Sequence, residues 1–108
     1  MQSGADALIA VLDQFSGGRV GVTETCREVA RHHNSHSKEQ FELFKPFIAV
    51  SSETDEFPMG SPRQFWSESA LKREDAKRAA IELRYAQNLR TAAIPLRQYA
   101  LAHGDRIR

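Results

Sequence analysis

The chain has 108 residues, 41% of them hydrophobic, so it fits one compact domain with a single core and is too short for two. A net charge of +1 argues against a dedicated nucleic-acid binder, and one cysteine, Cys26, excludes an intramolecular disulfide. Neither a secretion leader nor a run of about 18 apolar residues is present, which predicts one domain over residues 1–108, located in the cytoplasm and not in a membrane.

Two helices are predicted in the first third of the chain, where apolar residues recur at steps of three and four. The first covers residues 5–15 and ends at Gly17 and Gly18. The second has Thr23 as its expected N-cap residue and ends near Asn34.

A third helix is expected to start at Lys38, because Ser37 and Gln40 have the spacing of a capping box. Its apolar stripe consists of Phe41, Phe44, Phe47 and Ile48. Aromatic rings bury large areas, so this stripe should form the centre of the core. Pro46 interrupts the pattern and predicts a kink or a break.

Residues 51–62 are acidic and turn-forming, and they separate the third helix from the last one. Glu53, Asp55 and Glu56 place three negative charges in four residues, while two prolines and a glycine stop any helix. This composition predicts an exposed binding loop. The serine, threonine and aspartate side chains also suit caps and tight turns, so the alternative is a well-tied connector.

The last helix is the longest. A short turn with Pro62 at its first helical position precedes it, and Ser67 or Ser69 is expected to begin the helix itself. Pro95 lies deep in the pattern and should bend or split the helix by removing a backbone hydrogen bond. Gly104 ends the pattern, and the tail after it is expected to fray.

No segment alternates apolar and polar residues as a half-buried strand requires. The fold class predicted is therefore all-α, an antiparallel bundle of four to five helices with a long, proline-bent C-terminal helix.

The residues offer little chemistry. His32 and His36 are spaced to face one metal ion, but no third ligand accompanies them, and histidines also favour helix C-termini. Cys26 lies on an apolar stripe, where it packs as a small hydrophobe. No glycine-rich phosphate cradle or nucleophile turn is present. We expect no catalytic residue, no metal site and no cofactor.

Charge is divided unevenly along the chain. Residues 1–62 hold five Lys/Arg against nine Asp/Glu, a net charge of −4, and residues 63–108 hold ten against five, a net charge of +5. The halves either attract one another, within the fold or across a homodimer, or form separate docking faces. The basic last helix also suggests nucleic acid, but Glu74, Asp75 and Glu82 interrupt its positive field.

A basic protein partner is the preferred ligand of the acidic loop, with apolar anchors beside the carboxylates. The candidate partner-binding residues are Glu53, Asp55, Glu56, Phe57, Met59 and Trp66. Trp66 has an alternative place in the core, because a lone tryptophan in a small domain is usually buried.

A resemblance supports a binding function. The pattern consists of Ser52-Glu53-Thr54-Asp55, Pro58-Met59-Gly60, Arg63, Trp66 and Ala70-Leu71 before a long charged helix. It resembles small uncharacterised bacterial proteins over residues 47–85, and the resemblance carries no catalytic residues. In size and helical make-up the chain is also similar to cytoplasmic immunity proteins that neutralise secreted toxins.

The sequence therefore predicts a non-enzymatic binding protein, an immunity-type inhibitor whose acidic loop occupies the positively charged cleft of a toxin. One alternative is a homodimeric structural or regulatory helical protein. The other is nucleic-acid binding through the last helix.

Overall fold

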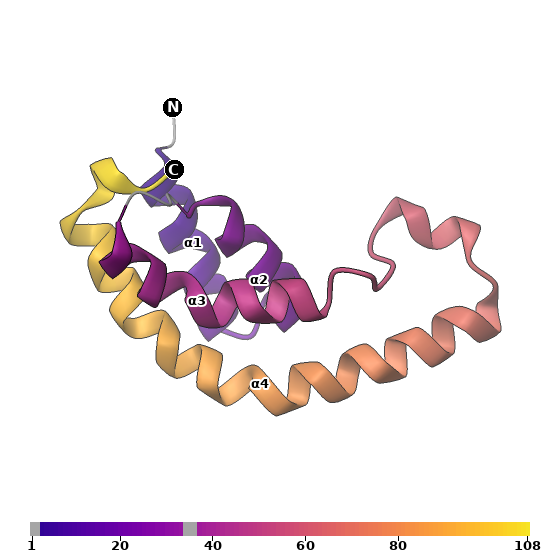
Figure 1. Cartoon of the computed structure of the whole chain (residues 1–108). Coiled ribbons are helices and arrows are strands. Elements are labelled where there is room, and N and C mark those ends of the chain that lie inside the picture. The colour runs from indigo at the N-terminus through magenta and orange to yellow at the C-terminus, as the bar shows by residue number, and fades with distance from the viewer. Residues whose placement is uncertain (1–2, 34–36) are drawn as a thin grey trace.

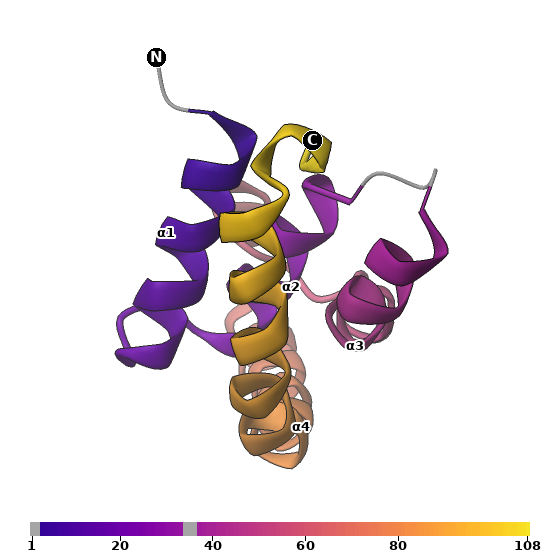
Figure 2. The same ribbon diagram turned by 90° about the vertical axis from the view of Figure 1, so that its left-hand side faces the viewer.

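The computed structural model describes residues 3–33 and 37–108. Its elements are α1 (Gly4–Ser16), α2 (Val22–Arg31), α3 (Lys38–Glu53), the 3-10 helix η1 (Ser61–Phe65), α4 (Glu68–Ala102) and the 3-10 helix η2 (Gly104–Arg106). No strand occurs in these two ranges, which confirms the all-α prediction. α2 packs between α1 and α3, and α4 runs across all three (Figure 1). Figure 2 shows the same bundle from one end.

Serine caps begin three of the four α-helices. The hydroxyl groups of Ser3, Ser37 and Ser67 each accept a hydrogen bond from the backbone N–H three residues later. This satisfies one of the N–H groups that has no partner inside the helix. The predicted starts of α3 and α4 are therefore confirmed. Gly18, with φ of 75°, follows α1 in the left-handed conformation that glycine adopts without strain.

α2 begins differently from the prediction. Its N-cap residue is Gly21, whose N–H donates to a carboxylate oxygen of Glu24 at 3.1 Å. The prediction that Thr23 is the N-cap is wrong, because Thr23 is fully buried in the first turn of the helix. There its N–H and its hydroxyl donate to the carboxylate of Glu82 on α4, at 3.1 and 3.0 Å.

Neither proline breaks its helix. α3 is continuous through Pro46 as far as Glu53, and α4 is continuous through Pro95. The predictions of a break at the first proline and of a split at the second are wrong. One lost backbone hydrogen bond is outweighed at each site by the buried residues on either side, since tertiary packing supplies most of a helix's stability. α4 curves along its length around the shorter helices (Figure 1).

The core forms where the second half of α4 crosses the other helices. Every buried residue of α4 lies at or after Leu89. The largest fully buried apolar side chains are Leu8, Leu12, Phe15, Phe44, Phe47, Leu89 and Leu96. Two of the four residues in the predicted α3 stripe are therefore confirmed as core. Ile48 packs partly buried against it, and Phe41 remains 40% exposed.

Residues 59–88, which we call the arm, extend from this core. The arm contains η1 and the first half of α4, and none of its residues is buried. In Figure 1 it leaves the end of α3, turns at η1 and returns along α4. The arm accounts for much of the 46 Å length of the molecule, against 29 and 26 Å in the other two directions.

The tail after α4 is ordered, so the prediction that it frays is wrong. Ile107 is 9% exposed and belongs to the core. The N–H of Arg108 donates to the carbonyl of His32 at 3.1 Å, and the side-chain amide of Gln40 donates to the carbonyl of Arg106 at 3.0 Å. These contacts join the tail to α2 and α3.

Candidate protein-binding surface

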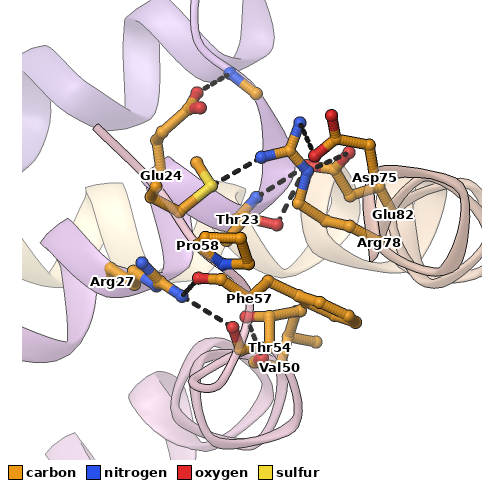
Figure 3. Close-up of polar contacts among 12 residues, drawn as sticks. Thr23, Glu24, Arg27, Val50, Thr54, Phe57, Pro58, Asp75, Arg78 and Glu82 are labelled. Carbon is orange, nitrogen blue, oxygen red and sulfur yellow. Dashed lines mark hydrogen bonds and ion pairs between the residues drawn. The ribbon is translucent and has the colours of Figure 1, made fainter. Parts of the chain in front are cut away.

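The turn after α3 is fastened to α2 by one arginine. Nη2 of Arg27 donates to the carbonyl of Thr54 at 2.6 Å (Figure 3). The same nitrogen donates to the carbonyls of Asp55 and Phe57, at 3.3 and 3.2 Å. Thr54 is fully buried, and its hydroxyl donates to the carbonyl of Val50 at 2.8 Å. The backbone of residues 54–57 is therefore a tied connector, as one of the two interpretations of the sequence predicts.

The acidic side chains of this turn point into solvent. Glu53, Asp55 and Glu56, which we call the acidic corner, are all exposed. Glu53 ends α3, so the predicted loop begins later than residue 51. None of the three carboxylates forms an ion pair with another described residue. The corner is thus a fixed backbone that carries three unpaired charges.

The predicted apolar anchors beside the corner are occupied within the fold. Phe57 is only 6% exposed, and Pro58 next to it is buried. Met59 is half-buried, and its sulfur accepts a hydrogen bond from Arg78 of α4. The proposed role of Phe57 as an accessible anchor is therefore not supported, because its side chain is buried.

Trp66 stands in the arm and not in the core. It is 41% exposed, and its neighbour Phe65 is 83% exposed, so the alternative that placed Trp66 in the core is wrong. Both residues lie at the turn between η1 and α4, at the tip of the arm (Figure 1). The tip and the acidic corner are separate places on the surface, because η1 carries the chain away from the end of α3.

An arginine–aspartate pair braces the tip. Arg63 of η1 makes two hydrogen bonds to the carboxylate of Asp75 on α4, both at 2.7 Å. It also donates to the carbonyl of Pro58 at 3.1 Å. The hydrogen bonds and the charge of Arg63 hold the pKa of Asp75 below its ordinary value, and the nearby Arg78 adds to this effect. The pair keeps η1 folded back on the first turns of α4.

A second polar chain joins the arm to α2. Arg78 lies between Asp75, 4.0 Å from its Nη2, and Glu82, 3.8 Å from its Nε (Figure 3). Glu82 in turn accepts the two hydrogen bonds from Thr23 at the start of α2. Sequence reasoning missed the contacts of Thr23 with Glu82, of Arg63 with Asp75 and of Arg27 with residues 54–57, since these partners lie 12 to 59 positions apart and follow no helical spacing.

A pocket lies between α3 and α4, and Glu53 forms part of its wall. Its volume is about 310 Å³. The residues that define it include Pro46, Ala49 and Glu53 from α3 and Tyr85, Asn88 and Leu89 from α4. The lining is mostly apolar. Glu53 is thus both a member of the acidic corner and part of the pocket wall.

Several basic residues of α4 already have partners. Arg97 forms an ion pair with Asp13 of α1 at 2.7 Å, and Lys77 lies 3.3 Å from Glu74. The guanidinium of Arg90 lies 5.9 Å from the ring centre of Phe15. Part of the positive charge of α4 is therefore engaged in contacts within the molecule.

The histidines and the cysteine have structural roles where the structure describes them. Cys26 is fully buried and packs in the core as predicted. Burial and the charge of Glu82 raise the pKa of its thiol to about 12, so the thiol stays protonated. The ring of His33 contacts Phe44, and Nδ1 of His32 lies 2.7 Å from the carbonyl of Arg108. His36 lies outside the described residues, and α2 ends at Arg31, three residues before its predicted end near Asn34. Within the described ranges, no group of three or more metal-binding side chains is found.

A comparison of the chain with protein-family models, curated proteins and solved structures found no match. None of the helices in residues 3–33 and 37–108 has the length and apolar character needed to cross a membrane.

Proposed function

We propose that this protein is a non-enzymatic, cytoplasmic binding module that docks its acidic corner against a positively charged surface of a protein partner. The observation that carries the proposal is the corner itself, where Arg27 fixes the backbone and leaves the charges of Glu53, Asp55 and Glu56 exposed. A preorganised charged surface loses little entropy on binding and accelerates encounter with an oppositely charged partner.

The distribution of ion pairs supports docking between molecules. Of the six ion pairs among the described residues, only Arg97 with Asp13 joins the acidic half of the chain to the basic half. Among the described residues, the two halves are therefore joined by a single ion pair, and most of the excess charge of each half is not neutralised by contact with the other. We favour one form of this function, an immunity-type inhibitor that covers the basic cleft of a toxin. The chain resembles such proteins in size and helical content.

The test is capture of the partner from the source-cell lysate, with the double variant Glu53→Lys with Asp55→Lys beside the wild type. We expect the variant to lose the partner because reversed charges repel a basic surface. A charge-matched control is Glu39→Lys with Asp105→Lys, since both positions are exposed and lie at the other end of the bundle. Capture of one partner by all three proteins contradicts the proposal, provided that each retains its far-ultraviolet circular dichroism.

A homodimer is a second candidate, and the outer face of α4 favours it. Leu83, Ile94 and Leu101 are 83%, 61% and 60% exposed. They are spaced by 11 and 7 residues, close to whole numbers of helical turns, so they share one face. Light scattering at high micromolar concentration should then give the mass of a dimer for the wild type and for Gln14→Arg, at an exposed position of α1, but of a monomer for Ile94→Arg. A monomeric wild type removes this candidate.

A further inference from the structure

The pocket between α3 and α4 combines an apolar wall with one charged group. Among the described residues that line it, Glu53 is the only one with a charged side chain. Tyr85 and Asn88 add groups that can form hydrogen bonds, and Pro46, Ala49 and Leu89 supply apolar surface. An apolar cavity with a few polar groups at fixed positions is the usual construction of a binding pocket.

The charge of the pocket is negative. Residues 42, 46, 49 and 53 follow one another at steps of four, three and four, so Glu42 lies on the same face of α3 as the pocket wall. The nearest basic residues along the two helices, Lys45, Arg84 and Arg90, lie about a quarter of a turn or more around from the pocket face, at 100° per residue. A ligand with an apolar part and a positive charge therefore complements this site.

The size of the pocket and its position favour a side chain of a protein partner. A volume of about 310 Å³ is at the lower limit of small-molecule sites and accommodates a single apolar side chain. Two further exposed carboxylates, those of Asp55 and Glu56, follow Glu53 in the chain and do not belong to the pocket lining. A peptide segment can fill the pocket and meet all of these charges at once.

We propose that this pocket receives an apolar side chain of the protein partner and that Glu53 pairs with a basic residue beside that side chain. The inference rests on the proposed function and gives it a specific contact. The apolar residue is the anchor, because a side chain buried in a pocket contributes more to affinity than exposed ion pairs around it. The acidic corner then sets the orientation and the rate of docking.

Capped peptides test the chemistry of the pocket by nuclear magnetic resonance of the labelled protein. The probe has one leucine followed by two lysines between glycines, and the controls replace the leucine with alanine or the lysines with glutamates. The peptides are added at about 10 mM, where a Kd of about 1 mM gives extensive saturation. We expect the amide signals of Ala49, Tyr85 and Asn88 to shift with the probe and not with either control peptide. Equal shifts with the glutamate peptide, or none with the probe, overturn the inference.

Two variants localise the binding. Ala49→Trp fills the pocket from an exposed helical position, and Ala79→Trp makes the same change at an exposed position of the arm. Affinity for the probe should fall at least about tenfold in the first variant and stay unchanged in the second. Glu53→Gln, which keeps the size of the side chain, should also weaken binding of the probe. Unchanged binding to both Ala49→Trp and Glu53→Gln overturns the inference.

Capture from the lysate separates this inference from the proposed function. Loss of the partner with Ala49→Trp and with the Glu53/Asp55 charge reversal supports both. A partner lost only on charge reversal leaves the proposed function standing and overturns the pocket contact. A partner retained by both variants overturns both.

Discussion

Arg27 is the residue on which the candidate surface most depends. It joins α2 to the three carbonyl groups that define the turn under the acidic corner. Its side chain is half-buried, so water replaces these hydrogen bonds poorly if the guanidinium is removed. The role is invisible in the sequence, because Arg27 sits between Glu24 and Glu28 like any basic residue of a solvated helix.

Arg27→Met should lower the free energy of unfolding by about 2 kcal/mol, the usual effect of losing hydrogen bonds to a charged group. Methionine retains most of the apolar stem, so the loss reports on the hydrogen bonds and not on packing. Urea denaturation followed by circular dichroism measures the change. The amides of Asp55 and Glu56 should also exchange faster with solvent, since their turn is no longer fastened.

Arg31→Met is the matched control for this measurement. Arg31 lies one turn later on α2 and is 74% exposed in its ion pair with Glu28. Exposed pairs of this kind contribute at most about 1 kcal/mol, and often nothing measurable. If the two variants are destabilised equally, Arg27 has no special role in holding the turn.

Among the elements, η1 depends most on a single interaction. It is a 3-10 helix of five residues with no buried side chain, and Arg63 is its link to α4 through Asp75. The lowered pKa of Asp75 makes this link sensitive to pH. A carboxylate whose pKa is lowered by folding contributes stability above its unfolded pKa, and the contribution is lost as pH falls through the folded pKa.

Acidification should therefore loosen the tip of the arm while the bundle remains folded. Trp66, the only tryptophan of the chain, follows η1 directly and reports on it by fluorescence. We expect its emission to shift to longer wavelength at acidic pH with little change in far-ultraviolet circular dichroism, since none of the core residues belongs to the arm. Asp75→Asn should show the shifted emission already at neutral pH.

Asp105→Asn, at an exposed position of η2, provides the comparison and should retain the pH response of the wild type. An Asp75→Asn protein with the same emission and the same acid transition as the wild type would show that the ion pair does not hold η1.

At the scale of the whole molecule, local signals in the sequence predicted the fold class and most helix starts. Serine caps and apolar steps of three and four depend on residues within one or two turns, so one sequence contains them completely. The break at Pro46, the split at Pro95 and the fraying of the tail were predicted wrongly for the opposite reason. Each of these segments is held by packing or hydrogen bonds to other elements, which overrides its local preference.

The candidate surface was predictable only in part. The acidic residues of the corner could be identified because a run of charges is rarely buried. Phe57 and Trp66 could not be placed, since both are aromatic residues in turn-rich sequence and their burial depends on where α4 passes. The pocket requires side chains from positions 46–53 and 85–89, which no sequence spacing brings together.

The late position of Leu89, Leu96 and Tyr99 also has a consequence for synthesis of the chain on the ribosome. These residues complete a core whose first member is Ala5. Glu82, which accepts the hydrogen bonds of Thr23, lies 59 positions after it in the chain. The first three helices can pack on one another as they leave the ribosome, but the part of their apolar surface that α4 covers is still exposed at that stage. We expect folding to wait until the end of α4 has emerged, so the growing chain depends on chaperones or on rapid translation for most of its length.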